Sequence, residues 1–316
     1  MSKTPQPHSI GTSGGRPEAP ATCSATSPSP QREGPEVRSP WRRLRAARDS
    51  AARQFALSEA LLTVGLPTNG RPALRWYLAR QPALILGNGQ KPEDADLAAC
   101  RAAGVTVFRR TSGGTAVLLD EDAVNVEVAL PAGHPLASAD LARSYQWAGD
   151  IWVEALHALG ISGIGAISIE DVRALPPLAK DDPLRLACYG TLSPFEVVAG
   201  PRKVVGLSQV RRRAGALYQM STYLRWRPER LAALLALSPN QRAALTQRLR
   251  DVSVGLDELA GRTIAAAEVI AAVEAALVSR LGITLKPARW TPTEREAAAR
   301  IEAERFTPVS LRCINA

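Results

Sequence analysis

The chain has 316 residues, of which 46% are hydrophobic and 22% are charged, as is ordinary for a globular protein with a sizeable core. No run reaches the ~18 uninterrupted apolar residues of a membrane-spanning helix, which argues against a membrane protein or a membrane partner. The net charge of +9 divides into +4 over the first 50 residues and +5 over the other 266, which is too dilute to predict a nucleic-acid partner.

Cysteine and histidine usage predicts neither a metal site nor a disulfide framework. The chain has three histidines, and its four cysteines lie far apart without CxxC spacing, at Cys23, Cys100, Cys188 and Cys313. The N-terminal segment lacks the apolar stretch of a secretory signal, so we expect a cytoplasmic protein. Residues 1–40 are rich in Ser, Thr, Pro and Gly with few large apolar side chains, and we expect them to form a disordered extension.

Between residues 41 and 130, segments with apolar residues three and four positions apart, typical of helices, are interspersed with alternating or short apolar runs, typical of strands. Glycines and Gln-Pro or Gly-Gly breaks separate the segments. In chain order, we expect a helix over 41–65, strands over 74–80 and 83–89, a helix over 92–104, and strands over 105–110, 115–120 and 123–130.

A helix over 138–160, capped by Ser138 or Asp140, follows these strands. Beyond it we expect strands over 185–191, 195–200, 203–210 and 216–224, and then helices over 228–237, 239–249, 263–282 and 291–306. Strands therefore dominate the first two-thirds of the chain and helices the last third. This order predicts an α+β fold rather than a regular βαβ repeat.

The segment 108–120 places two arginines, two hydroxyl residues and a Gly-Gly pair between two apolar runs. Backbone N–H groups in such a turn can approach an anion or a carbonyl closely, and Arg109 and Arg110 add positive charge beside them. Taken alone, the segment is better explained as a hairpin turn with surface arginines. It is not a P-loop, because no GK[ST] sequence follows.

Two further segments carry side chains that could react. Lys203, one of only five lysines beside 34 arginines, begins an apolar strand where its amine can be desolvated. Cys188 ends an apolar run without a nearby histidine, and Lys203, across an expected hairpin, would activate it if the two strands pair in register. Taken alone, a solvated lysine and a small core cysteine are the more usual outcomes. The triple arginine 211–213 is either a phosphate contact or, more simply, a charged hairpin tip.

Together, these segments resemble the lipoate–protein ligase and octanoyltransferase family. The shared features are an RR-x-[ST]-GG loop, a K-V-x-G-x-x-Q strand and an R-x-x-G-x-L-x-Q segment in the same order, within a resemblance that covers most of residues 50–306. It implies an α+β fold with a mixed, largely antiparallel sheet flanked by helices, as in biotin and lipoate ligase catalytic domains. We accordingly expect a catalytic domain over 41–226 and a small helical C-terminal part of the same domain over 227–316.

Within this family the chain is most similar to the cysteine-type octanoyltransferases. Their Cys-aromatic-x-x-x-Ser-x-aromatic-Glu pattern is matched by Cys188, Tyr189, Ser193, Phe195 and Glu196. The resemblance implies transfer of an octanoyl group from acyl carrier protein to a lysine of a lipoyl domain such as glycine cleavage H protein. It implies no cofactor for this reaction.

The resemblance also assigns roles to individual residues. Cys188 would be the nucleophile, and the ammonium of Lys203 would favour its thiolate. Backbone amides near Gly113 and Gly114 would stabilise the oxyanion. The residues expected to bind the acyl group are Arg75, Arg109, Arg110, Ser112, Gly113, Gly114 and Gly206. Arg75 is expected to lie beside the loop.

Two departures from the family pattern keep other functions open. The family's His-Asp pair after the loop is Leu119-Asp120 here, and its later histidine corresponds to Met220. An ATP-dependent lipoate ligase would require ATP and Mg²⁺, Lys203 and the Gly-Gly loop, but no cysteine. A non-catalytic protein that binds acyl groups or carriers is the third possibility. Biotin ligation ranks last, because its usual glycine-rich nucleotide motif is absent.

Overall fold

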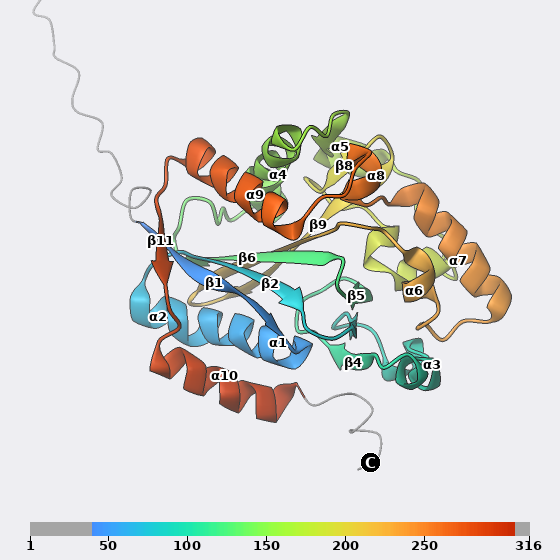
Figure 1. Cartoon of the computed structure of the whole chain (residues 1–316), viewed down its shortest axis with the longest axis horizontal. Helices are drawn as coiled ribbons and strands as arrows, with labels where there is room; N and C mark the ends of the chain where they lie inside the picture. Colours follow the sequence, from blue (N-terminus) through green and yellow to red (C-terminus); the bar gives the residue numbers. More distant parts are fainter. Residues whose placement is uncertain (1–39, 307–316) are drawn as a thin grey trace, which may run out of the picture. The chain divides into compact units, whose positions relative to one another are not determined.

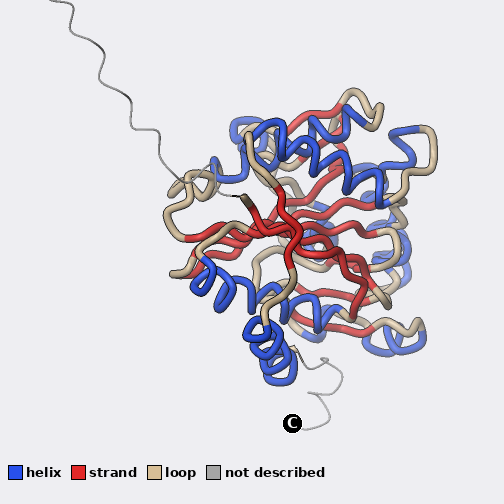
Figure 2. Tube along the Cα trace, turned by 60° about the vertical axis from the view of Figure 1, so that its left-hand side comes forward, coloured by secondary structure: helices blue, strands red, loops and turns tan. Residues whose placement is uncertain are grey.

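The computed structural model describes residues 40–306, so the expected N-terminal extension, except Pro40, lies outside the described residues, as do Cys23 and Cys313. A large sheet occupies the centre of the described chain, with α4 (Gln146–Ala158) and α9 (Ala266–Leu281) on one side. On the other side lies α1 (Ala51–Ala60), with α10 (Pro292–Arg305) packed behind it (Figures 1 and 2). Within residues 40–306, none of the helices combines the length and the apolar character needed to cross a membrane.

The main sheet has eight strands in the order β11-β1-β2-β6-β10-β9-β8-β7. Its strands are β1 (Trp41–Asp49), β2 (Ala73–Ala79), β6 (Ala123–Pro131), β7 (Ile164–Ala166), β8 (Val197–Ala199), β9 (Arg202–Arg212), β10 (Gly215–Tyr223) and β11 (Leu285–Ala288). β11, β1 and β2 pair in parallel, and all the other neighbours are antiparallel. The predicted mixed, largely antiparallel sheet is therefore confirmed.

A second sheet has three strands in the order β4-β3-β5. They are β3 (Ala83–Leu86), β4 (Thr106–Arg109) and β5 (Val117–Leu119). The remaining helices are α2 (Leu66–Asn69), α3 (Leu97–Ala102), α5 (Ile169–Ala174), α6 (Pro228–Ala232), α7 (Pro239–Val252) and α8 (Leu256–Ala260). The residues after 226 thus supply β11 to the main sheet as well as helices, and the division expected at residue 226 remains a prediction.

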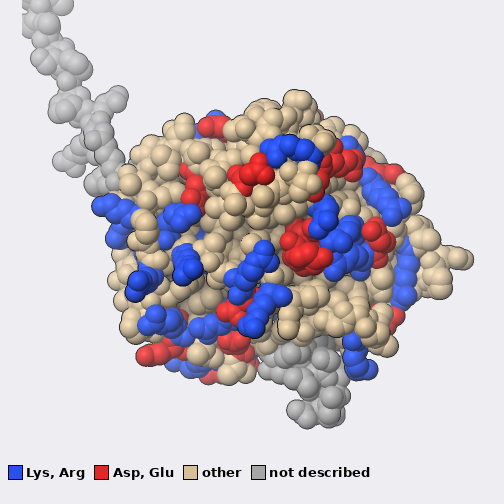
Figure 3. Space-filling view, viewed as in Figure 1, with Lys and Arg blue, Asp and Glu red and all other residues tan. Residues whose placement is uncertain are grey.

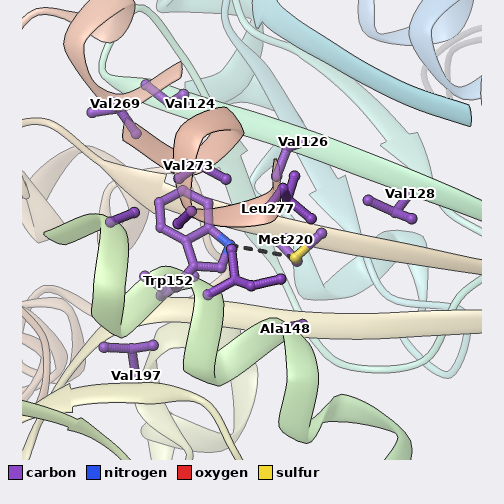
Figure 4. Close-up of a cluster of buried hydrophobic side chains, with 14 of the residues drawn as sticks. Val124, Val126, Val128, Ala148, Trp152, Val197, Met220, Val269, Val273 and Leu277 are labelled. Carbon is purple, nitrogen blue, oxygen red and sulfur yellow. Dashed lines mark hydrogen bonds between the residues drawn. The ribbon is translucent and has the colours of Figure 1, made fainter. Parts of the chain in front are cut away.

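The two faces of the main sheet differ in polarity because side chains alternate along each strand. On one face, Val124, Val126 and Val128 of β6 pack against Trp152 of α4 and against residues of α9 (Figure 4). The opposite face carries polar residues, namely Arg75, Asn125, Glu127 and Gln219 together with Tyr77. The apolar face forms the main core, which leaves the polar face for a binding site.

Three local predictions were wrong. Residues 41–49 form a strand rather than the start of a helix, because the segment pairs in parallel with both β2 and the distant β11. The expected strand over 185–191 consists of short 3-10 turns at Pro183–Leu186 and Cys188–Gly190. The helix expected from residue 138 begins at Gln146, and Asp140 instead caps the preceding turn by accepting hydrogen bonds from the N–H groups of residues 142 and 143.

Charged side chains are distributed unevenly over the described surface. Lys and Arg gather over the side of the molecule where β1 and β11 lie (Figure 3), and Arg45, Arg71 and Lys286 are exposed there. Elsewhere on the same face, acidic and basic side chains stand side by side. One such group joins the β5–β6 turn to α6, where Arg230 pairs with Asp120 at 2.8 Å and with Glu121 at 2.9 Å. Much of the charge is therefore neutralised locally.

A buried ion pair anchors α10 to the edge of the main sheet. Arg42 on β1 donates two hydrogen bonds to Glu294, at 2.6 and 2.9 Å, and Glu294 is 0% exposed. A Cβ atom on Gly65 would lie 2.6 Å from a Glu294 oxygen, so the glycine makes room for the carboxylate. Burial acts to raise the pKa of Glu294, but the hydrogen bonds and charge of Arg42, together with the hydrogen bonds of Thr291, hold the pKa below its ordinary value.

Replacing Glu294 by Gln should lower the free energy of unfolding by about 3 kcal/mol, because Arg42 would keep a buried charge without its counter-ion. Urea unfolding at neutral pH measures the difference. The exposed Glu296→Gln on the same helix is the control and should change stability by less than about 0.5 kcal/mol. Because the pKa of Glu294 is lowered in the folded state, the difference between wild type and Glu294→Gln should narrow as the pH falls. A constant difference down to acid pH would contradict this assignment.

Candidate active site

Backbone pairing brings the Gly-Gly loop and the cysteine turn together. Ala116, which follows the loop, donates to the Leu186 carbonyl at 3.0 Å, and the Cys188 N–H donates to the Ala116 carbonyl at 2.9 Å. These bonds form a parallel bridge between Ala116 and Ala187. Cys188 is thus held beside the loop by main-chain hydrogen bonds, although it is not on a strand.

The half-buried Cys188 side chain opens into a pocket between the polar face of the main sheet and the small sheet. The lining is mostly apolar, with a few polar groups contributed by the loop and by the central strands. It consists of Phe55, Tyr77, Ile85, Arg110, Val117, Leu119, Asn125, Cys188, Gly206, Leu207, Ser208, Gln219, Met220 and Ser221. An apolar pocket with a few placed polar groups and one thiol can bind a small acyl group next to a nucleophile.

Arg110 is the charged residue that contacts the thiol. One Nη atom donates to the Thr115 carbonyl at 3.1 Å and lies 3.9 Å from Cys188 Sγ, within reach of a hydrogen bond to sulfur. The backbone of Gly114 is left-handed, with φ of +90°, and a Cβ atom there would lie 2.5 Å from the Arg110 guanidinium. A Cβ atom on Gly87 would overlap the Gly114 carbonyl. The second glycine of the loop therefore allows Arg110 to fold back toward the cysteine.

Lys203 approaches the main chain of Cys188. Its Nζ forms a 2.6 Å ion pair with Glu196 and donates to the carbonyl oxygens of Cys188 at 3.1 Å and Thr191 at 3.2 Å. Both Lys203 and Glu196 side chains are only 2% exposed. The expected hairpin pairing of Cys188 with Lys203 was wrong, because β9 pairs with β8 and β10 while Cys188 lies in a turn. Lys203 and Cys188 are still in contact, through the hydrogen bond from Nζ to the main-chain carbonyl of Cys188.

Glu196 ties the cysteine segment to β9. Besides the ion pair with Lys203, its carboxylate accepts hydrogen bonds from the N–H of Ser193 at 2.8 Å and of Leu207 at 3.1 Å. The preceding Phe195 has a φ of +66°, the left-handed conformation that glycine favours. The sequence pattern singled out Glu196 only as part of a family motif, and its partners could not be predicted from spacing.

Tyr189 fixes the residue next to the cysteine. Its hydroxyl donates to the Ser221 carbonyl at 2.7 Å, and its ring stacks on Trp226 with centroids 5.1 Å apart. The Lys203 ammonium lies 5.2 Å from the ring centroid. Burial raises the pKa of Tyr189 well above its ordinary value, so the phenol stays protonated. The aromatic residue of the motif is thus a rigid support for Cys188.

The other expected acyl-binding residues occupy different environments. Within residues 40–306, the hydrogen bonds of Arg75 go to Gln54 and Ser58, and its ion pair goes to Glu127, so its polar contacts are with α1 and β6 rather than with the Gly-Gly loop. Arg109 is exposed at the end of β4.

The remaining expected residues lie on the loop or in the pocket. Ser112 is buried, and its hydroxyl has no hydrogen-bond partner within the described chain. Gly113 is exposed on the loop. Gly206 lines the pocket, and a Cβ atom there would lie 3.2 Å from the Lys203 Cε. The structure thus brings together Cys188, Arg110, Lys203 and Gly206 most directly.

The two residues at the family's histidine positions face different surroundings. Leu119 is buried in the pocket wall with Val117. The sulfur of Met220 accepts a hydrogen bond from the Trp152 indole at 3.3 Å, in the core on the apolar face of the sheet (Figure 4). Neither residue can move a proton, so any proton transfer at this site falls to other groups.

Two other sequence features have structural explanations. Burial raises the pKa of the Cys100 thiol to about 11, so this cysteine is a core residue without a ready thiolate. The triple arginine 211–213 lies at the turn between β9 and β10, which confirms the hairpin tip.

The chain is similar to known proteins in sequence and in fold. Residues 50–278 match the model of the lipoyl protein ligase A/B catalytic domain. Octanoyltransferase LipM of Kyrpidia tusciae is 32% identical over 266 residues, covering 84% of this chain and 95% of that protein. LipM of Carboxydothermus hydrogenoformans is 26% identical over 268 residues, covering 84% of this chain and 96% of that protein.

Among solved structures, the bipartite lipoate protein ligase of Thermoplasma acidophilum has a TM-score of 0.66 at 18% identity, covering 84% of this chain and 92% of that chain. A lipoate-protein ligase A bound with ATP has a TM-score of 0.64 at 19% identity, covering 84% of this chain and 95% of that chain. At this identity, the two structures establish the fold.

Replacing Gly114 by Ala should lower the free energy of unfolding by about 1–3 kcal/mol, because the left-handed backbone and the contact with Arg110 both oppose a Cβ atom. Urea unfolding measures the loss. The control is Gly113→Ala, since a Cβ atom there meets nothing within 4 Å and the backbone is not left-handed. Equal stability of the two variants would contradict the role assigned to the second glycine.

Proposed function

Because the chain belongs to the lipoyl protein ligase A/B catalytic domain family and is an acyltransferase, we propose that it moves octanoyl groups in protein lipoylation through a thioester on Cys188. The observation that carries this proposal is the Cys188 thiol in a mostly apolar pocket, 3.9 Å from the Arg110 guanidinium. We propose acyl carrier protein as the donor. The proposed acceptor is a lysine of a lipoyl domain such as that of glycine cleavage H protein.

The proposed reaction consists of two acyl transfers. In the first, the Cys188 thiolate attacks the carbonyl carbon of the octanoyl thioester, a new C–S bond forms, and the carrier leaves as a thiolate that takes up a proton from solvent. In the second, the neutral amine of the acceptor lysine attacks the Cys188 thioester, an amide forms, the amine loses a proton, and the cysteine sulfur leaves. No cofactor and no net redox change is needed.

The pocket composition supports an aliphatic acyl group. Phe55, Ile85, Val117 and Leu119 contribute apolar wall, and each methylene buried against such a wall contributes about 0.8 kcal/mol. Leu119 increases this apolar surface where the family pattern has a histidine. The pocket therefore favours the hydrocarbon part of the substrate while the thiol faces its carbonyl.

The ion pair and hydrogen bonds that Lys203 already makes favour the transferase over an ATP-dependent ligase. In a ligase, a free lysine ammonium would be expected to contact the phosphate of an activated acyl group. Here, Lys203 is paired with Glu196 and donates to two carbonyls. A lipoate ligase, requiring ATP and Mg²⁺, remains the second candidate because the fold is shared with such enzymes.

We also propose that residues 41–226 and the residues after 226 act as one catalytic domain. The supporting observation is that β11 extends the main sheet by pairing with β1. The cytoplasmic location expected from the sequence remains a prediction.

The purified protein, mixed with octanoyl-acyl carrier protein without ATP, should gain one octanoyl group by intact-mass spectrometry. Cys188→Ser should lose this adduct, because a hydroxyl at the same place forms no thiolate, whereas Cys100→Ser should retain it. Adding a lipoyl domain should then remove the octanoyl group from the enzyme and place it on the acceptor. Absence of an adduct on wild type would overturn the proposal. Modification of the lipoyl domain by Cys188→Ser with ATP, Mg²⁺ and lipoate would instead establish the ligase.

A further inference from the structure

We propose that Arg110, and not Lys203, is the cation that stabilises the Cys188 thiolate. This inference rests on the proposed function, since it assigns a catalytic residue to the same nucleophile. It also changes the role that sequence resemblance implies for Lys203, which becomes a positioning residue.

All three N–H donors of Lys203 already have partners other than the thiol. An ammonium group has three N–H donors and no acceptor. Those of Lys203 are directed to Glu196 at 2.6 Å, to the Cys188 carbonyl at 3.1 Å and to the Thr191 carbonyl at 3.2 Å. No donor remains for the thiol, and the adjacent carboxylate balances the positive charge.

The positive charge of Arg110, in contrast, is not balanced by a carboxylate of the described chain. Within residues 40–306, no carboxylate forms an ion pair with Arg110, and its Nε is buried without a hydrogen-bond partner. Its other contacts are the neutral Thr115 carbonyl and Cys188 Sγ. A partly buried guanidinium without a counter-ion is stabilised when a neighbouring group becomes negative. The thiolate of Cys188 is such a group, at a distance of 3.9 Å.

The loop between β4 and β5 packs closely around Arg110. The left-handed Gly114 leaves space that a Cβ atom would take from the guanidinium, and the same Cβ atom would lie 3.8 Å from Cys188 Sγ. The loop conformation therefore allows the arginine and the sulfur to lie in contact. A hairpin turn that only displayed surface arginines would not need this close packing.

The other titratable groups near the thiol leave Arg110 as its only unbalanced cation within the described chain. Tyr77 lines the same pocket, while Tyr189 and Tyr223 lie behind the cysteine turn. Burial raises the pKa of all three phenols far above neutral pH, so they stay uncharged. Glu196 and Lys203 balance each other.

The test is the pH profile of Cys188 alkylation by iodoacetamide, an uncharged reagent, measured by mass spectrometry of the peptide that contains Cys188. Arg110→Gln should move the midpoint of the profile upward by about one pH unit and slow alkylation at pH 7 by about tenfold. Arg110→Lys, which keeps a positive charge, should move the midpoint less. The matched control is Arg109→Gln, because Arg109 is exposed on the neighbouring position and should leave the midpoint unchanged.

A double variant tests Lys203 without leaving a buried charge unpaired. Glu196→Gln with Lys203→Met removes both charges and retains an amide oxygen for one of the two N–H groups, of Ser193 and Leu207, that donate to separate carboxylate oxygens in the wild type. This variant should move the midpoint by much less than Arg110→Gln does, and near-ultraviolet circular dichroism checks that it is folded. A wild-type midpoint in Arg110→Gln would overturn the inference. An upward shift in the double variant as large as that expected for Arg110→Gln would overturn it as well.

The outcome is separable from that of the proposed function. Alkylation needs no acyl donor, so a shifted midpoint in Arg110→Gln supports the inference even if wild type forms no octanoyl adduct. Conversely, an octanoyl adduct on wild type with an unchanged midpoint in Arg110→Gln would sustain the transferase and reject this role for Arg110.

Discussion

The buried ion pair between Lys203 and Glu196 is the interaction on which the cysteine segment depends. It joins β9 to residues 188–196, which contain no strand or long helix that could position them otherwise. Ionic groups at 2% exposure have lost most of their hydration, so the pair is stable only if further hydrogen bonds satisfy both partners. They do: the carboxylate accepts two backbone N–H groups and the ammonium donates to two carbonyls. The pair thus specifies one conformation of the turn that holds Cys188.

A second constraint comes from glycine at two positions that approach other atoms closely. Gly87 follows β3 and lies against the Gly114 carbonyl, while Gly114 lies against the Arg110 side chain. Together they let the loop between β4 and β5 fold over the pocket, where Ala116 pairs with the cysteine segment. Gly114 and Arg110 of this loop therefore act together. The glycines provide the space, and Arg110 occupies it.

Local patterns predicted strands such as β6, where valines alternate with polar residues, because this information lies within the segment itself. They failed for β1, where Trp41 and Leu44 have helical spacing but are buried by pairing with a strand from the other end of the chain. The same limit applies to the site. Family resemblance named Cys188, Lys203 and Arg110, and the structure places all three within one small region. Which of the two cations contacts sulfur depends on Glu196 and on the Gly114 conformation, and neither effect can be predicted from spacing.

The different chemistry of guanidinium and ammonium groups suits Arg110 to stabilising the thiolate and Lys203 to positioning the cysteine turn. A guanidinium does not release its proton near neutral pH, so Arg110 stays charged whether the sulfur is a thiolate or an acylated thioester. When acylation removes the charge from Cys188, the guanidinium again lacks a counter-ion. The negative charge that develops on the acyl carbonyl during the second transfer is a suitable partner. Lys203 could not change partners in this way, because releasing Glu196 would leave a buried carboxylate unpaired. Arg110 can therefore stabilise negative charge first on the sulfur and then on the acyl oxygen, while Lys203 holds the cysteine turn in place.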